Sequence, residues 1–216
     1  MKKLLFGLIA TVMLSNLSFG QNQLNISDYG KLHNICIESY YKKYGTDIKD
    51  TNIKEMLNNQ LLIMQAQYPE QFKNLDINDL YNYFAPFNSV KDFNLSVMWG
   101  NYKSKIMKKG DIPIGIIDLM DDLTKNTYDY DTVVLKVQTL KKDPSLNDTD
   151  IKRLNIFLNV LESSNQLWNS KTGKRDVPCR YSTIICDAGG SLMFFYCGPL
   201  SIVCGACCSL CDAANC

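Results

Sequence analysis

The apolar residues between positions 21 and 165 recur at intervals of three and four, the spacing that places side chains on one face of an α-helix. Glycine or proline follows several of these stretches, where either residue would end a helix. The pattern predicts a mostly α fold, a bundle of six or seven helices, within the ranges 27–44, 53–64, 76–84, 89–106, 111–123, 133–140 and 147–161. One range is ambiguous, because residues 128–137 contain enough valine and tyrosine to form a strand instead.

Residues 1–20 follow a different pattern. Two lysines precede an apolar run from Leu4 to Leu14, and small and polar residues come after it. This order is typical of an export signal, with cleavage expected between Gly20 and Gln21. We therefore expect a secreted protein, outside the cell or at its surface, whose thiols meet oxidising surroundings.

The rest of the chain divides by composition into three parts. A helical domain is expected over 21–165, a polar, turn-rich linker over 166–178, and a cysteine-rich tail over 179–216. Two β-prone runs in the tail, 181–186 and 192–197, flank turn-forming residues that begin at Asp187. The tail is therefore predicted to contain a small β-hairpin.

The tail holds eight of the nine cysteines of the chain: Cys179, Cys186, Cys197, Cys204, Cys207, Cys208, Cys211 and Cys216. So short a segment is too small to be stable on apolar burial alone. An even number of cysteines in an exported protein favours a disulfide framework, although eight cysteines allow 105 pairings and the sequence does not choose among them.

Two other interpretations of the tail are open. Cys204-x2-Cys207 and Cys208-x2-Cys211 have the spacing of two interlocked metal knuckles. The 24 residues from Ala188 to Cys211 carry no charge and are long enough for a membrane helix, which Gly198-Pro199 would interrupt. As a cross-linked mini-domain, the tail has more large apolar side chains than 38 residues can hide, so we expect some of them to be exposed.

The signal segment, the helical region and the eight-cysteine block from Cys179 to Cys216 resemble the secreted proteins related to fulvocin C, a bacteriocin. The resemblance rests on the cysteine count and on the apolar, nearly uncharged residues between the cysteines. It implies a secreted peptide toxin that is made within a larger precursor. The partner would be the membrane or a receptor of a target cell, and a processing protease could release the toxin.

Two places in the sequence could be cut to release the tail. Cleavage after Lys174-Arg175 would free a fragment with all eight tail cysteines, although such a pair is also ordinary in a solvated linker. Gly189-Gly190 resembles a leader cleavage site, but a turn explains these glycines more simply. The helical domain could then keep the tail soluble or shield it.

Little in the chain points to catalysis. His33 and Cys36 lie three residues apart on a predicted helix, so they could form a nucleophilic pair, but a buried histidine beside a buried cysteine is the plainer interpretation. Asp118, Asp121, Asp122, Asp129 and Asp131 lack the spacing of a calcium loop. We expect no enzyme activity, no cofactor and no bound metal.

The net charge of the chain limits the classes of partner that it can attract. Loss of residues 1–20 removes two lysines and leaves 21 basic and 22 acidic residues, a net charge of −1. The mature chain has no basic field that would attract nucleic acid. The leading prediction is a bacteriocin-like precursor, and the alternative is a structural or adhesion protein anchored at the cell surface by its apolar C-terminal segment.

Overall fold

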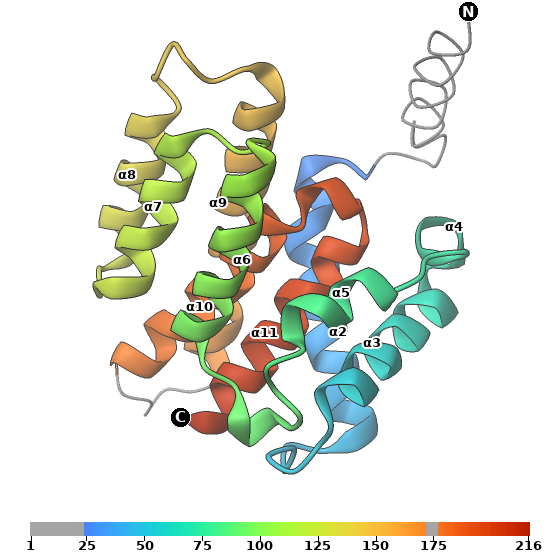
Figure 1. Cartoon of the computed structure of the whole chain (residues 1–216). Helices are drawn as coiled ribbons and strands as arrows, with labels where there is room; N and C mark the ends of the chain where they lie inside the picture. The colour runs from blue at the N-terminus through green and yellow to red at the C-terminus, as the bar shows by residue number, and fades with distance from the viewer. Residues whose placement is uncertain (1–23, 172–176) are drawn as a thin grey trace, which may run out of the picture.

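The computed structural model describes residues 24–171 and 177–216, which form ten α-helices and two short 3-10 helices (Figure 1). The expected mostly α class is confirmed. The export signal with Gly20 and Gln21, and the candidate cleavage pair Lys174-Arg175, lie outside the described residues.

The first helices follow the predicted pattern closely. They are α2 (Ile26–Tyr44), α3 (Ile53–Gln67), α4 (Pro69–Phe72) and α5 (Asn78–Phe84). Asn25 caps α2 through a reciprocal pair of bonds with Asp28, and Gly45 ends it with a positive φ of 80°. The single turn α4 was not predicted, because Pro69 starts a new turn there as well as ending α3.

The middle of the chain adds the 3-10 helix η1 (Val90–Asp92), α6 (Leu95–Lys109), α7 (Ile114–Lys125), α8 (Tyr130–Leu140) and α9 (Asp148–Lys171). Asp129 accepts a bond from the backbone N–H of Thr132 and so starts α8 as a helix. The strand alternative for residues 128–137 is therefore wrong. The start of the expected linker is also helical, because α9 continues to Lys171.

The tail differs most from the prediction. It contains α10 (Val177–Met193), the 3-10 helix η2 (Phe195–Cys197) and α11 (Leu200–Asn215), so the expected β-hairpin is wrong. Gly198 adopts a positive φ of 56° at the turn, and Pro199 then precedes α11. The two helices form an antiparallel helical hairpin, which we call the C-terminal hairpin.

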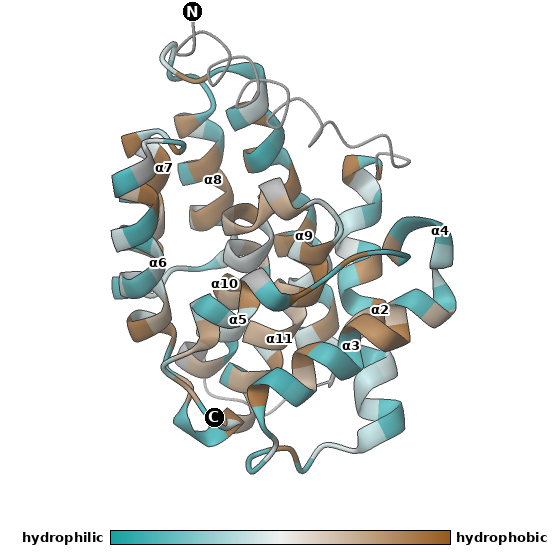
Figure 2. Ribbon diagram, turned by 45° about the vertical axis from the view of Figure 1, so that its right-hand side comes forward, coloured by the Kyte–Doolittle hydropathy of each residue, from teal (hydrophilic) through white to brown (hydrophobic). Residues whose placement is uncertain are grey.

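The C-terminal hairpin lies in the middle of the molecule (Figure 1). Its helices contact each other most extensively, α10 also packs on α9, and α11 also packs on α2 and α3. Figure 2 shows α10 and α11 as a largely apolar centre, while the surrounding helices carry polar residues on their outer sides. The tail and the helical domain thus share one hydrophobic core.

This placement corrects the expectation that the tail exposes apolar surface. Its large side chains are covered by the helices around it, and the buried ones are Leu192, Met193, Phe194, Leu200, Ile202, Val203 and Leu210. The expectation applies to a tail that must bury its own apolar surface. The helical domain supplies the missing cover.

Candidate functional site

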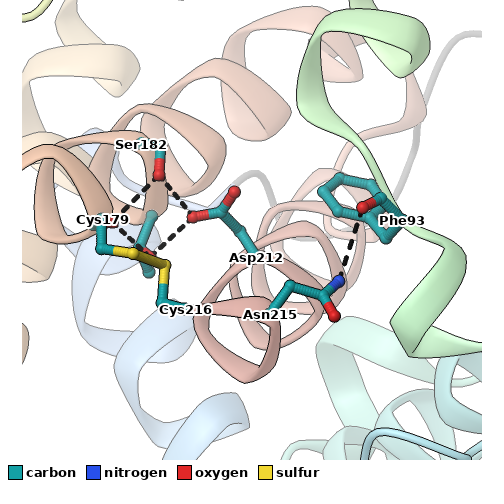
Figure 3. Close-up of a disulfide and its surroundings, with 7 residues drawn as sticks. Phe93, Cys179, Ser182, Asp212, Asn215 and Cys216 are labelled. Carbon is teal, nitrogen blue, oxygen red and sulfur yellow. Dashed lines mark hydrogen bonds between the residues drawn. A yellow bond between two sulfur atoms is a disulfide. The ribbon is translucent and has the colours of Figure 1, made fainter.

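A disulfide closes the open end of the C-terminal hairpin. Cys179 in the first turn of α10 is bonded to Cys216, 37 residues further on, with their Cα atoms 5.7 Å apart (Figure 3). Beside it, the hydroxyls of Ser182 and Thr183 donate to one carboxylate oxygen of Asp212, at 2.7 and 2.8 Å. These contacts tie the end of α11 to the beginning of α10.

The end of α11 is also fixed to the helices that surround it. Asn215 donates from its side-chain amide to the backbone oxygen of Val90 at 2.7 Å. It also donates more weakly to the backbone oxygen of Phe93 at 3.4 Å (Figure 3). At the opposite end, the hydroxyl of Tyr102 donates to the backbone oxygen of Met193. The hairpin is therefore attached to its surroundings at its base and near its turn.

The backbones of the two hairpin helices approach each other closely at a pair of glycines. A Cβ atom placed on Gly190 would lie 2.6 Å from the Cα atom of Gly205. A Cβ atom placed on Gly205 would lie 2.8 Å from the backbone oxygen of Asp187. Glycine is required at both positions because the two backbones touch there. Gly190 was interpreted as part of a turn, and it is instead a helix contact.

The remaining tail cysteines are mostly buried thiols rather than bridges. Cys186, Cys204, Cys207, Cys208 and Cys211 are all fully buried, and only Cys179 and Cys216 of the described residues form a disulfide. Burial raises the pKa of Cys186, Cys204 and Cys207, and it raises that of Cys208 to about 11. These thiols stay protonated at neutral pH, which makes them poor nucleophiles and poor metal ligands.

The structure gives no support to the metal interpretation of the tail. Cys204, Cys207, Cys208 and Cys211 lie along α11 instead of forming a knuckle. Within residues 24–171 and 177–216, no group of three or more histidine, cysteine, aspartate or glutamate side chains is arranged to hold a metal ion. None of the helices in these ranges is long and apolar enough to cross a membrane.

A buried ion pair lies at the centre of the fold. Nε2 of His33 on α2 is 2.7 Å from Oδ1 of Asp187 on α10, and both side chains are fully buried. The other oxygen of Asp187 accepts hydrogen bonds from Ser164 and, at 2.9 Å, from Nε1 of Trp168, both on α9. We call these four residues the polar centre, and it links α2 and α9 to the hairpin.

The polar centre favours a charged histidine. Burial lowers the pKa of His33, but the charge of Asp187 and hydrogen bonds to Asp187, Asn34 and the Gly205 backbone more than offset this, so the pKa is raised. Nδ1 of His33 lies 3.2 Å from the side-chain oxygen of Asn34. Both ring nitrogens thus face acceptors, which only the imidazolium can satisfy with two N–H groups.

The structure does not bring His33 and Cys36 together as a nucleophilic pair. Cys36 is fully buried, and burial raises the pKa of its thiol well above its usual value. His33 is instead engaged by Asp187, which sequence reasoning assigned to a turn. The available signal was that Asp187 is a lone charge among apolar neighbours on one helix, where a buried charge requires a partner.

The acidic residues of α7 and the following loop form ordinary ion pairs and caps. Asp121 accepts from Nε1 of Trp99 at 2.5 Å and pairs with Lys103, while Asp122 pairs with Lys136 at 2.9 Å. Trp99 and Lys103 belong to α6 and Lys136 to α8, so these contacts hold neighbouring helices together. They do not form a calcium site.

Comparison with known proteins adds no relative. No protein-family model matches the chain, and neither a curated protein nor a solved structure matches it.

Proposed function

We propose that this protein is an exported, non-enzymatic toxin-like precursor, and that its C-terminal hairpin acts on the membrane of a competing bacterium after release. The observation that carries the proposal is the burial of an almost uncharged helical hairpin at the centre of the fold. An ordinary core is built from one face of each helix, whereas here α11 is buried along nearly its whole length, from Leu200 to Cys211.

Separation from the other helices would expose a large apolar surface. Side chains such as Phe194, Ile202 and Val203 are fully or almost fully buried, and each is worth about 1.5–3 kcal/mol when transferred from water. A protein that exposes a contiguous surface of this kind meets a membrane or a partner. The surrounding helices would keep the hairpin soluble until then.

The covalent connections suit release by a single cut. Among the described residues, the covalent connection between the helical domain and the hairpin runs through the segment between Lys171 and Val177. The Cys179–Cys216 disulfide lies entirely within the hairpin. Cleavage in that segment, where Lys174-Arg175 occurs, would leave the hairpin in one piece and held only by non-covalent contacts.

The alternative of an anchored surface or adhesion protein needs an apolar segment that lipid can reach in the folded protein. The C-terminal hairpin is enclosed by α2, α3 and α9, which favours the precursor over the anchor. The closed polar centre and the protonated thiols likewise offer no group to a substrate, which supports a non-enzymatic role.

The test is site-specific cleavage of the full chain. One variant carries a specific protease site within residues 172–176, and a matched control carries the same site within the exposed loop of residues 141–145, between α8 and α9. Cleavage of the first variant is expected to release dye from vesicles of phosphatidylethanolamine and phosphatidylglycerol and to inhibit bacterial growth. The cleaved control, whose hairpin stays linked to α9, and both uncleaved proteins should do neither.

Two outcomes would overturn the proposal. In one, the protein cut within residues 172–176 leaves vesicles intact and bacteria growing although the fragment has dissociated. In the other, the uncut protein is recovered embedded in membranes, which would favour the anchored alternative.

A further inference from the structure

The hairpin helices meet along a regular seam. On α10 the seam residues are Cys179, Thr183, Cys186 and Gly190, at steps of four, three and four. On α11 and at its C-terminal cap, the opposing residues, in antiparallel order, are Cys216, Asp212, Cys208 and Gly205. Three of the four opposing pairs are in direct contact: the disulfide, the Thr183–Asp212 hydrogen bond and the glycine approach. The fourth pair, Cys186 and Cys208, lies between the last two, and both of its side chains are fully buried.

Cys186 and Cys208 therefore oppose each other across α10 and α11 as Cys179 and Cys216 do, about two helical turns further along the seam. Both side chains are fully buried, and the interaction between the two thiols is one cause of the raised pKa of Cys186. The neighbouring contacts on either side, at Thr183–Asp212 and Gly190–Gly205, fix the register, so no sliding of one helix is needed to bring the two sulfur atoms together.

The other buried cysteines of α11 are placed differently. Cys204, Cys207 and Cys211 share another face, and Cys207 and Cys211 both interact with Tyr40 of α2. Cys207 and Cys211 lie four residues apart on α11, so an interaction between these two thiols stays within one helix. The seam thus distinguishes one pair of thiols from the rest.

We propose that Cys186 and Cys208 are the site of a second disulfide, formed when the chain folds in the presence of a disulfide donor such as oxidised glutathione. The thiolate of one cysteine attacks the donor, which forms a mixed disulfide and expels one donor thiolate. The thiolate of the other cysteine then displaces the second donor thiolate, and the two expelled thiolates take up the two protons lost by the cysteines to become thiols. The protein disulfide is the oxidation product, and the donor is reduced.

The reaction has to precede burial, because the finished fold encloses both sulfur atoms and raises the pKa of both thiols. Two disulfides, Cys179–Cys216 and Cys186–Cys208, would join α10 to α11 covalently in the half of the hairpin that lies away from its turn. In the proposed function, on which this consequence rests, α10 and α11 would then leave the helical domain as one rigid unit.

The test is disulfide mapping of the full chain after refolding in a glutathione redox buffer. The refolded protein is denatured without reduction, its thiols are alkylated, and it is digested with chymotrypsin, which cuts at Phe194 and Phe195 and so separates Cys186 from α11. We expect a cross-linked peptide that joins Cys186 to Cys208, besides the Cys179–Cys216 bridge. Cys36 and Cys204 should be fully alkylated.

Two single variants complete the design. Cys208→Ser is expected to leave Cys186 fully alkylated, whereas Cys204→Ser should leave the Cys186 cross-link intact. Full alkylation of Cys186 in the wild-type chain, or its bonding to any cysteine other than Cys208, would overturn the inference. The wild-type measurement does not depend on the folding of either variant, and it uses no membrane, so its failure is distinct from failure of the proposed function.

Discussion

Replacement of Asp187 by asparagine tests whether the polar centre holds the C-terminal hairpin in place. The substitution keeps the size of the side chain and removes one charge from a pair that is fully buried on both sides. It leaves the His33 imidazolium facing only neutral acceptors. Removal of one partner from a buried ion pair costs about 3–5 kcal/mol, a large part of the roughly 5–15 kcal/mol by which a native protein is stable.

The effect should depend on pH in a defined direction. The pKa of His33 is raised in the folded protein, so the stability gained from its protonation is fully present below its unfolded pKa of about 6.5 and is lost as pH rises through the folded value. Asp187→Asn removes most of that gain. The difference in unfolding free energy between wild type and variant should therefore be largest near pH 6 and smaller in alkaline solution.

The measurement is guanidinium unfolding followed by circular dichroism at pH 6 and at alkaline pH, with the disulfide kept oxidised. Ser164→Ala is the matched control, because it removes one hydrogen bond to Asp187, worth about 1.5–3 kcal/mol, and keeps the ion pair. It should lower stability with a much weaker change between the two pH values. An Asp187→Asn difference below about 1 kcal/mol, or the same difference at both pH values, would refute the role given to the ion pair.

Two further substitutions test the hairpin seam. Gly205→Ala should destabilise the fold by about 1–3 kcal/mol, because its Cβ would lie 2.8 Å from the backbone of α10. Its control is Gly100→Ala, whose Cβ meets nothing within 4 Å and which should stabilise α6 by up to about 1 kcal/mol. Equal shifts in the melting temperatures of the two variants would contradict the close approach. Cys179→Ser opens a loop of 37 residues and should lower the free energy of unfolding by about 2–4 kcal/mol, and an unchanged denaturation midpoint would show that the bridge adds nothing.

The helices of the first 165 residues could be predicted from local information. Apolar spacing marks their buried faces, and Gly45 and Gly110 end α2 and α6 with positive φ values, as expected of glycine at a helix end. Residues 128–137, where the pattern leaves a strand open as an alternative to the expected helix, show the limit of this approach. Valine and tyrosine favour a strand, but the Asp129 cap and packing on α7 and α9 decide for a helix.

The hairpin and the polar centre depended on contacts that no local pattern contains. The sequence from Asp187 to Gly190 has the composition of a turn. In the fold, however, glycine is needed there because Gly190 touches α11 and Gly189 faces Met120 of α7. His33 and its partner are separated by most of the chain. Only the assembled fold shows that the uncharged run of the tail is a core and that its one interior charge is matched.

The cysteine content of the tail takes on a different meaning in this fold. Cysteine is small, weakly polar and among the residues most often found fully buried, so it can fill a close helix–helix contact that leucine would force apart. Cys208 and Gly205 face α10 at such a contact, and Cys204, Cys207 and Cys211 are buried on another face of α11. A high cysteine count therefore does not by itself require as many bridges as the count allows. The seam predicts bridges only where cysteines oppose each other across α10 and α11, and elsewhere the same residue serves as a compact apolar side chain.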